Sequence, residues 1–227
     1  NFFGEGDHST EGSKCPSILH KKPSLSPKTV FYFQKWISGK MQKVIFFVFR
    51  RTHFNCEFFI PADIWLSGKI KKVAVIGASP GIENIGERES RVKHDTNLAK
   101  KIEDDGIPGF VKFWEQLPLF ESQLHLPQAI QKRIRAGRLA NNQIGLANSL
   151  RGMGTGQQPY IHDQLQKANK PVLLLAGSKD QKFIEIAKSL EKSVPNAETF
   201  TIPNAGHAAH LENQKDSVTK IINFLTK

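Results

Sequence analysis

Three short runs of apolar residues in the last two thirds of the chain predict strands. They are residues 70–78 (IKKVAVIGA), 171–180 (PVLLLAGSKD) and 197–203 (AETFTIP). The first two are rich in Val, Ile and Leu and end at turn-forming or charged residues. This pattern is typical of parallel strands that are buried on both faces.

Helical periodicity fills the intervals between these strands. Between the first two strands the predicted helices are residues 87–105, 106–117 and 126–150, broken at Gly106, Pro118 and Pro127. A Gly-rich return, residues 151–159, precedes the second strand, and amphipathic helices are predicted over 182–194 and 217–227. The order predicts the C-terminal half of a mostly parallel α/β sheet with an inserted helical cap.

The first third of the chain shows no such periodicity. Eight of the 16 Phe residues lie between Phe31 and Phe59, mixed with Lys, and no helix or strand is assigned there. A basic aromatic segment could stack on single-stranded nucleic acid. No RNP-like or zinc-knuckle motif accompanies it, so we expect no nucleic-acid partner.

The net charge of +11 is concentrated in the same part of the chain. Residues 1–72 carry 12 Lys and Arg against 5 Asp and Glu, whereas residues 73–227 carry 20 against 16. A basic chain indicates nucleic-acid binding when its charge forms one coherent face. The excess here belongs mainly to the first third.

The remaining composition indicates a soluble protein with one core, or one core with a cap. The chain has 227 residues and a mean hydropathy of −0.37, and its longest apolar run, residues 44–49, is too short to cross a membrane. Cys15 and Cys56 fit no disulfide framework or metal spacing, and no secretory pattern is present, so we expect a cytoplasmic setting. The start at Asn1 without a methionine suggests a mature fragment, a trimmed form or an incomplete gene product.

Two polar residues follow neighbouring strands of the predicted sheet. Asp180 comes directly after the second strand, and His207 lies in NAGHAAH after the third. Because sites form at the carboxyl ends of parallel strands, the pair matches the acid and base of a Ser…Asp…His triad, about 2.6–3.2 Å apart. The carboxylate would fix the imidazole tautomer and stabilise its protonated form. Alternatively, Asp180 is a helix N-cap and His207 a loop histidine in a Gly-rich turn.

Ser79 is a candidate nucleophile by spelling alone. The stretch from Gly77 to Gly81, GASPG, fits the G-x-S-x-G motif of a nucleophile elbow. In an elbow the N–H of the residue after the serine forms part of the oxyanion hole, but Pro80 has no N–H. The proline also favours an extended backbone at Ser79. We therefore interpret the stretch as a strand end that turns through Pro-Gly.

Two further patterns predict no metal and no cofactor. His207 and His210 have an H-x-x-H spacing, but no HExxH motif, paired cysteines or carboxylate cluster accompanies them. Gly152, Gly154 and Gly156 follow no strand and lack the Lys-Ser/Thr of a phosphate loop. We expect this glycine run to be a flexible return from the cap.

Five segments carry a resemblance to a known family. ASPG…ERESR…D, FVKFWEQLPLFESQ, SLRGMGTGQQP, LLLAGSKDQKF and AGHAAHLEN follow one another between residues 70 and 227. Together they resemble the 2-succinyl-6-hydroxy-2,4-cyclohexadiene-1-carboxylate synthases of menaquinone (vitamin K2) biosynthesis, which have the α/β-hydrolase fold. At the other end, NFFGEGDHS is similar to the D-x-x-G-x-G-x-S loop that precedes the elbow in such hydrolases. In the family ASPG lies one strand beyond the elbow, which also implies a structural turn at Ser79.

The resemblance implies a lyase rather than a hydrolase. In the family a serine activated by a His-Asp pair removes a proton from a 5-enolpyruvyl precursor, and pyruvate leaves. Asp180 and His207 resemble that acid and base. Arg91 and Arg138 resemble cap arginines that hold the substrate carboxylates, for which the planar guanidinium is suited.

The same resemblance implies an aromatic residue and a lysine near the substrate. Trp114 resembles a pocket aromatic, and Lys182 follows the triad acid closely enough to lie near the pocket. The alternatives are that both cap arginines are solvated helix residues and that Trp114 belongs to the cap core. The implied partner is a small carboxylated substrate, and the sequence gives no oligomeric state.

The elbow is where the chain departs from the family. No G-[YF]-S-x-G-G-R string lies between residues 10 and 72, and the nearest candidates, Ser38 and Ser67, lack both flanking glycines in register. The early His-Gly loop that supplies the other oxyanion donor is also absent, and we expect that the chain starts too late to contain it. One hypothesis is that residues from about 11 to 69 come from a shifted reading frame of an AT-rich gene. The alternative is divergence to a non-catalytic α/β-hydrolase-like protein that binds an acidic small molecule.

The resemblance also divides the chain. Residues 1–69 are an aberrant remnant of the N-terminal core, residues 70–82 and 160–227 form the α/β-hydrolase core, and residues 83–159 form the helical cap. The expected function is a menaquinone-pathway lyase, with its activity in this chain limited by the absent elbow.

Overall fold

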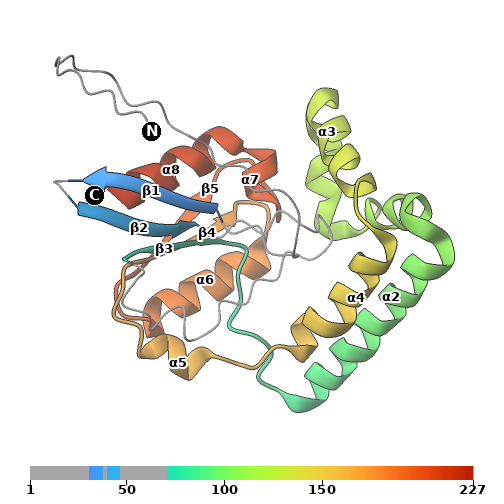
Figure 1. Ribbon diagram of the computed structural model, residues 1–227, viewed down its shortest axis with the longest axis horizontal. Helices are drawn as coiled ribbons and strands as arrows, with labels where there is room; N and C mark the ends of the chain where they lie inside the picture. Colours follow the sequence, from blue (N-terminus) through green and yellow to red (C-terminus); the bar gives the residue numbers. More distant parts are fainter. Residues whose placement is uncertain (1–30, 38–39, 47–70, 227) are drawn as a thin grey trace, which may run out of the picture.

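A three-stranded parallel sheet forms the core of the described chain (Figure 1). The computed structural model describes residues 31–37, 40–46 and 71–226. The strands are β3 (Val73–Ile76), β4 (Val172–Gly177) and β5 (Ala197–Ile202), in the order β3-β4-β5. The three predicted strands are therefore confirmed, and their carboxyl ends meet at one edge of the sheet.

Alternate side chains of the strands pack against helices on opposite faces of the sheet. Leu174 faces α5 (His162–Gln166) and α6 (Gln181–Ser193), in one buried cluster. Leu173 faces α8 (Gln214–Thr226), in a second buried cluster. Because both faces are covered, the strands read as continuous apolar runs in the sequence.

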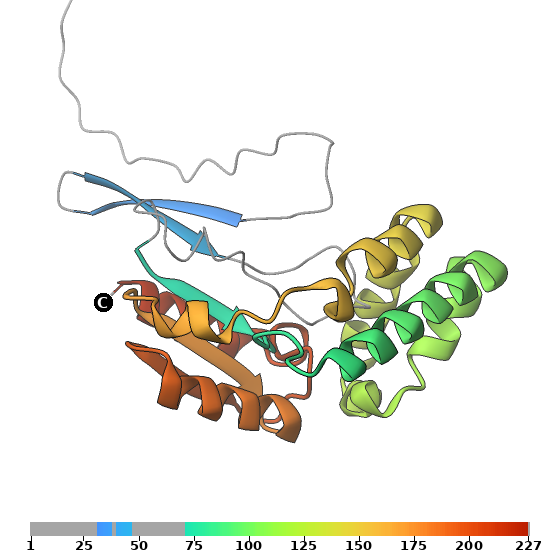
Figure 2. The ribbon, with the colours of Figure 1, turned by 90° about the horizontal axis from the view of Figure 1, so that it is seen from below.

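The elements between β3 and α5 form a helical layer beside the sheet, which we call the cap (Figure 2). It consists of α2 (Ile85–Trp114), η1 (Pro118–His125), α3 (Gln128–Leu139), α4 (Gln143–Met153) and η2 (Thr155–Gln157). Helices α2 and α4 lie side by side and, together with η1, bury a separate cluster that includes Phe110, Phe120 and Leu150. The predicted fold class, a parallel α/β sheet with an inserted helical cap, is confirmed.

The predicted helix breaks have different outcomes in the cap. Gly106 has φ 67° and ψ 173° and kinks α2 where the break was predicted. Pro118 does not simply end a helix, because it starts the 3₁₀ helix η1. The predicted continuous helix over 126–150 is wrong, since Asn142 interrupts it and caps α4 by accepting the Gly145 N–H at 2.8 Å.

The expectation of a flexible Gly-rich return at residues 151–159 is also wrong. The first three of these residues continue α4, and residues 155–157 form η2. A Cβ on Gly154 would lie 2.2 Å from Asp95 Oδ2, and one on Gly156 would lie 2.6 Å from the Arg88 carbonyl oxygen. The glycines are therefore needed for close packing against α2 rather than for flexibility.

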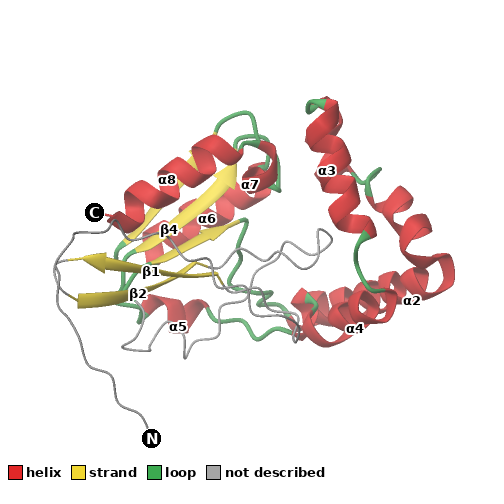
Figure 3. Cartoon of the chain, turned by 45° about the horizontal axis from the view of Figure 1, so that its top comes forward, coloured by secondary structure: helices red, strands yellow, loops and turns green. Residues whose placement is uncertain are grey.

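A β-hairpin occurs in the region where the sequence assigned no element (Figure 3). Strands β1 (Phe31–Ile37) and β2 (Lys40–Phe46) pair antiparallel, from Phe31 opposite Phe46 to Ile37 opposite Lys40. The two strands are separated by the dipeptide Ser-Gly, which is a turn signal. The irregular pattern of apolar residues around this dipeptide is why the sequence did not predict a hairpin. The predictions for NFFGEGDHS, Ser38 and Ser67 lie outside the described residues.

None of the helices in the described ranges is both long enough and apolar enough to span a bilayer.

Candidate functional site

Asp180 and His207 meet at the carboxyl edge of the sheet. Asp180 follows β4, His207 lies in the loop after β5, and Asp180 Oδ2 is 2.6 Å from His207 Nδ1. Both side chains are buried, with 6% and 2% of their surfaces exposed. The distance agrees with the spacing that the order of strands predicted.

The two carboxylate oxygens of Asp180 have separate partners. Oδ1 accepts the Phe183 N–H at 3.5 Å in the first turn of α6, while Oδ2 faces His207. The helix N-terminus also favours a negative charge at this position. The N-cap and triad-acid interpretations of Asp180 are therefore compatible.

Close backbone packing fixes the loop that carries His207. The Lys179 N–H donates to the Ala205 carbonyl at 2.9 Å, which ties the loop to the turn after β4. A Cβ on Gly177, the last residue of β4, would lie 2.1 Å from the Gly206 carbonyl oxygen. Only glycine fits at this point, because any side chain would push the loop away from the strand.

The imidazole of His207 is enclosed by a strand end and an aromatic ring. Gly77, just after β3, has φ +59°, and a Cβ there would lie 3.3 Å from His207 Cε1. The ring of Phe183 lies 4.6 Å from the imidazole, centroid to centroid. These contacts leave the ring little room to turn, which keeps Nδ1 directed at Asp180.

This geometry suits His207 to act as a general base. A carboxylate on Nδ1 fixes the tautomer and stabilises the imidazolium, so proton transfer would use Nε2. Among the described residues no group of three or more His, Cys, Asp or Glu side chains is arranged to hold a metal ion. In this arrangement His207 Nε2 is the atom that would exchange a proton with a nucleophile or a substrate group.

Comparison with known proteins places these residues in a family. Residues 67–214 match the family model of the alpha/beta hydrolase fold. The chain belongs to the alpha/beta hydrolase fold family. The order of Asp180 and then His207 at successive strand ends is the order that this family uses for its acid and base.

Two relatives with curated names share a narrower likeness with this α/β-hydrolase chain. A Bacillus subtilis protein, provisionally named 2-succinyl-6-hydroxy-2,4-cyclohexadiene-1-carboxylate synthase, is 41% identical over 158 residues, which are 70% of this chain and 58% of that protein. The synthase of the same name from Photorhabdus laumondii is 33% identical over 150 residues, which are 66% of this chain and 51% of that protein. The chain thus spans little more than half the length of these relatives.

A solved structure shows the same narrower likeness. MenH from S. aureus superimposes with a TM-score of 0.69 and 36% sequence identity, over 73% of this chain and 64% of that chain. An esterase from Thermogutta terrifontis, with a TM-score of 0.59 and 20% identity, shares the fold.

Arg138, one of the two predicted substrate-binding arginines, lies buried inside the cap. Its guanidinium donates to Glu115 Oε1 at 3.2 Å and to Gln123 Oε1 at 2.9 Å, and it lies 4.9 Å above the Phe120 ring. Arg135 pairs with the same Glu115 carboxylate. Arg138 is therefore not an ordinary solvated helix arginine.

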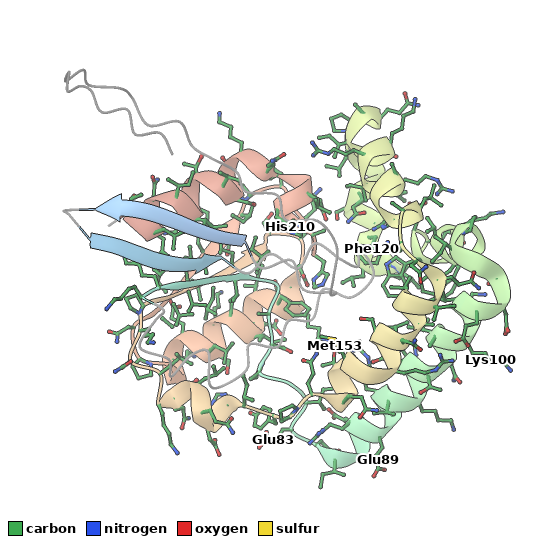
Figure 4. The ribbon with its side chains drawn as sticks, in the orientation of Figure 1. Glu83, Glu89, Lys100, Phe120, Met153 and His210 are labelled. Carbon is green, nitrogen blue, oxygen red and sulfur yellow. The ribbon has the colours of Figure 1, made fainter. Side chains whose placement is uncertain are left out.

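Trp114 occupies the adjoining part of the cap core. Its ring lies 5.5 Å from those of Phe110 and Phe120, and only 7% of the residue is exposed. Figure 4 shows Phe120 on the side of the cap that faces the sheet domain and His210. The alternative interpretation of Trp114 as cap core agrees with this packing, and its role as a pocket aromatic stays a prediction.

The other two residues predicted to contact the substrate, Arg91 and Lys182, lie in α2 and α6. Arg91 is in the first half of α2, where its Nε donates to the buried Asp95 at 2.9 Å. Lys182 is exposed in the first turn of α6, with Nζ 5.4 Å from the centre of the Phe183 ring. Lys182 thus contacts the Phe183 ring that also packs on His207, and the substrate-binding roles of Lys182 and Arg91 stay predictions.

Ser79 has the turn structure that its proline predicts. Its Oγ accepts the Gly81 N–H at 3.4 Å, and the Pro80 carbonyl accepts the Ile161 N–H at 2.8 Å. Gly81 has φ +99°. The stretch is a turn between the core and the cap, and the geometry shows no elbow at Ser79.

Two buried polar residues were not found by sequence reasoning. Glu212 accepts the Gly206 N–H at 2.6 Å and the Ala208 N–H at 3.2 Å, on either side of His207. Gln123 of η1 donates to Glu212 Oε1 at 3.3 Å. Both residues lie in segments that carry the family resemblance, Gln123 at the end of FVKFWEQLPLFESQ and Glu212 in AGHAAHLEN, but no pattern in the sequence marks their burial.

Proposed function

We propose that this site belongs to a 2-succinyl-6-hydroxy-2,4-cyclohexadiene-1-carboxylate synthase, a carbon–oxygen lyase that eliminates pyruvate from a 5-enolpyruvyl precursor. One observation carries the proposal: the buried Asp180–His207 pair, 2.6 Å apart, lies in a segment with 41% identity to a relative of that name. The MenH structure from S. aureus supports the same assignment.

His207 and Asp180 have defined roles in this reaction. His207 Nε2 would take a proton from the nucleophilic serine, which in turn removes a proton from the substrate ring. The electron pair left behind moves into the ring to complete the diene, and the C–O bond breaks so that the enolate of pyruvate departs. This enolate takes up a proton to become pyruvate, and loss of the proton from the imidazolium returns His207 to its neutral form. Asp180 stabilises the imidazolium that forms on His207.

The cap supplies the groups that suit a substrate with several carboxylates. Arg138 presents a buried guanidinium whose partners include Glu115 and Gln123, so a substrate carboxylate would share it with them. Lys182 offers a second cation near the His207 side of the site. Arg91, which donates to Asp95, is proposed to hold another substrate carboxylate, and Trp114, which stacks on Phe110, is proposed to be the pocket aromatic.

The nucleophile is the open part of this proposal. Ser79 lies in a turn, and Ser38 and Ser67 lie outside the described residues. With no G-x-S-x-G-G-R string in the chain, we propose that this chain retains the acid and base but has at most trace lyase activity. The expected cytoplasmic location also stays a prediction.

Incubation of the purified chain with the 5-enolpyruvyl precursor, followed by assay of pyruvate, tests the activity. Calorimetric titration with the diene product tests the site separately, since binding does not need the serine. Product binding without pyruvate release is the expected result. Absence of product binding to the folded chain would contradict the proposal, and rapid pyruvate release would contradict the trace activity.

A non-catalytic protein that binds an acidic small molecule would also bind the product. The two hypotheses separate when the nucleotide sequence across codons 1–72 is read in all three frames. A G-x-S-x-G-G-R string in a shifted frame supports descent from an active lyase, whereas its absence from every frame supports divergence.

A further inference from the structure

Glu212 is a buried carboxylate that accepts three hydrogen bonds. Oε2 accepts the Gly206 N–H at 2.6 Å, and Oε1 accepts both the Ala208 N–H at 3.2 Å and Gln123 Nε2 at 3.3 Å. Only 8% of the residue is exposed. A carboxylate is the side chain that can satisfy donors at both oxygens, because it is an acceptor only.

The two backbone donors flank His207 directly. Gly206 precedes His207 and Ala208 follows it, so the Glu212 carboxylate fixes the peptide groups on both sides of the imidazole. The same loop rests on the end of β4 at Gly177. The position of His207 relative to Asp180 thus depends on the backbone hydrogen bonds that Glu212 accepts.

Gln123 connects this carboxylate to the cap. Its Oε1 accepts from Arg138 Nη2 at 2.9 Å, and its Nε2 donates to Glu212 Oε1. A donor on one side and an acceptor on the other allow only one orientation of the amide. The backbone also meets the cap at this point, where a Cβ on Gly206 would lie 2.1 Å from Ser122 Oγ.

We propose that Glu212 is a positioning residue for His207 and that Gln123 links Glu212 to Arg138. These hydrogen bonds would fix the position of the cap relative to the loop after β5 that carries His207, which we call the base loop. The inference rests on the proposed function only in assigning proton transfer to His207. Movement of Arg138 on binding a carboxylate would be transmitted through two hydrogen bonds to the loop of the base.

The test compares Glu212→Gln with Glu121→Gln, a matched control on an exposed glutamate of η1, in the full chain without ligand. In E212Q the new amide group places a donor against other donors. The amide hydrogens of Gly206 or Ala208 should exchange about tenfold faster or more, as for loss of a hydrogen bond to a charged group. The ¹⁵N signals of the His207 imidazole should also move from a single Nδ1–H tautomer towards a mixture, while E121Q changes neither.

A reciprocal swap separates positioning from general damage. In E212Q/Q123E, the carboxylate introduced at position 123 accepts from both Arg138 and the amide introduced at position 212. That amide keeps an oxygen for the Gly206 N–H, so the His207 signals should return towards those of the wild type. Unchanged His207 signals in a folded E212Q, or no recovery in the swap, would overturn the proposal.

If E212Q does not fold, Gln123→Leu decides the link to the cap. It should shift the His207 signals while leaving the Gly206 amide protected, and unchanged signals would overturn the proposal. These measurements need no substrate, so a failure of product binding would count against the lyase assignment and not against this inference.

Discussion

The backbone of Gly206 packs directly against the side chain of Ser122, across the boundary between the base loop and the cap. A Cβ on Gly206 would lie 2.1 Å from Ser122 Oγ and 2.9 Å from Ser122 Cβ. The hydroxyl could rotate away, but the Cβ could not. The cap and the loop that carries His207 are therefore in contact with no space for an added methyl group.

We expect Gly206→Ala to lower the free energy of unfolding by about 1–3 kcal/mol, because overpacking forces the cap and the loop apart. Urea denaturation measures this change. Gly152→Ala is the control, since a Cβ there meets nothing within 4 Å and lies in α4, where Ala is favoured over Gly by about 0.5–1 kcal/mol.

The clash can be relieved from the other side. Gly206→Ala combined with Ser122→Gly should recover most of the lost stability, because the atom nearest the new methyl group is removed. Equal losses in the single and double variants would contradict direct packing between the two residues.

Asp180→Asn tests the interaction with His207. The substitution removes the negative charge 2.6 Å from Nδ1, which favours the imidazolium, while keeping the size of the side chain. The ¹⁵N signals of the His207 imidazole should therefore move in D180N from a single Nδ1–H tautomer towards a mixture, as measured by NMR. The exposed Asp163 on α5 provides the control, D163N, and a shift of similar size there would contradict a specific pair.

Arg138→Met tests whether the buried arginine supports the cap. It leaves the buried Gln123 oxygen without its donor, while Glu115 keeps Arg135, and this should cost about 1–3 kcal/mol of unfolding free energy. Arg133→Met, on the exposed face of the same helix, should change it by less than about 0.5 kcal/mol. Product binding should weaken in R138M and not in R133M, and equal binding in the two variants would remove Arg138 from the ligand site.

Tyr160 offers a prediction on pH dependence. Burial, followed by the charges of Glu83 and Asp163 and a hydrogen bond with Glu83, raises the pKa of the Tyr160 phenol. Each cause disfavours the phenolate, so Glu83→Gln should move its ionisation to lower pH. Absorbance titration in a Tyr32→Phe background isolates Tyr160, because the chain has only two tyrosines. An unchanged midpoint would contradict the contribution of Glu83.

The sheet and the Asp180–His207 pair could be predicted because each depends on local sequence. Continuous apolar runs mark strands that are covered on both faces, and parallel strands bring their carboxyl ends to one edge. Pro80 also predicted a turn rather than a nucleophile elbow at Ser79, because proline has no N–H for an oxyanion hole. Each of these features follows from a local property of the sequence, either a run of apolar residues or a proline at one position.

The contacts between the cap and the core could not be predicted in this way. Glu212 and Gln123 are 89 residues apart, and neither belongs to a periodic pattern that marks it as buried. Gly154 and Gly156 looked like a flexible linker because close packing and flexibility both select glycine. Asn142 caps the start of α4 and so separates α4 from α3. An Asn within a helical pattern can either cap a new helix or face solvent, and tertiary packing decides between the two.

The most direct test of the whole account is pyruvate release by a restored chain, with a G-x-S-x-G-G-R segment grafted between residues 10 and 70. We expect the restored chain to convert the 5-enolpyruvyl precursor, His207→Ala to reduce its rate about a thousandfold or more, and Ser79→Ala to change it little. The unmodified chain should release only traces of pyruvate. A restored chain that binds the diene product yet releases no pyruvate, or one that stays fully active without His207, would contradict the account.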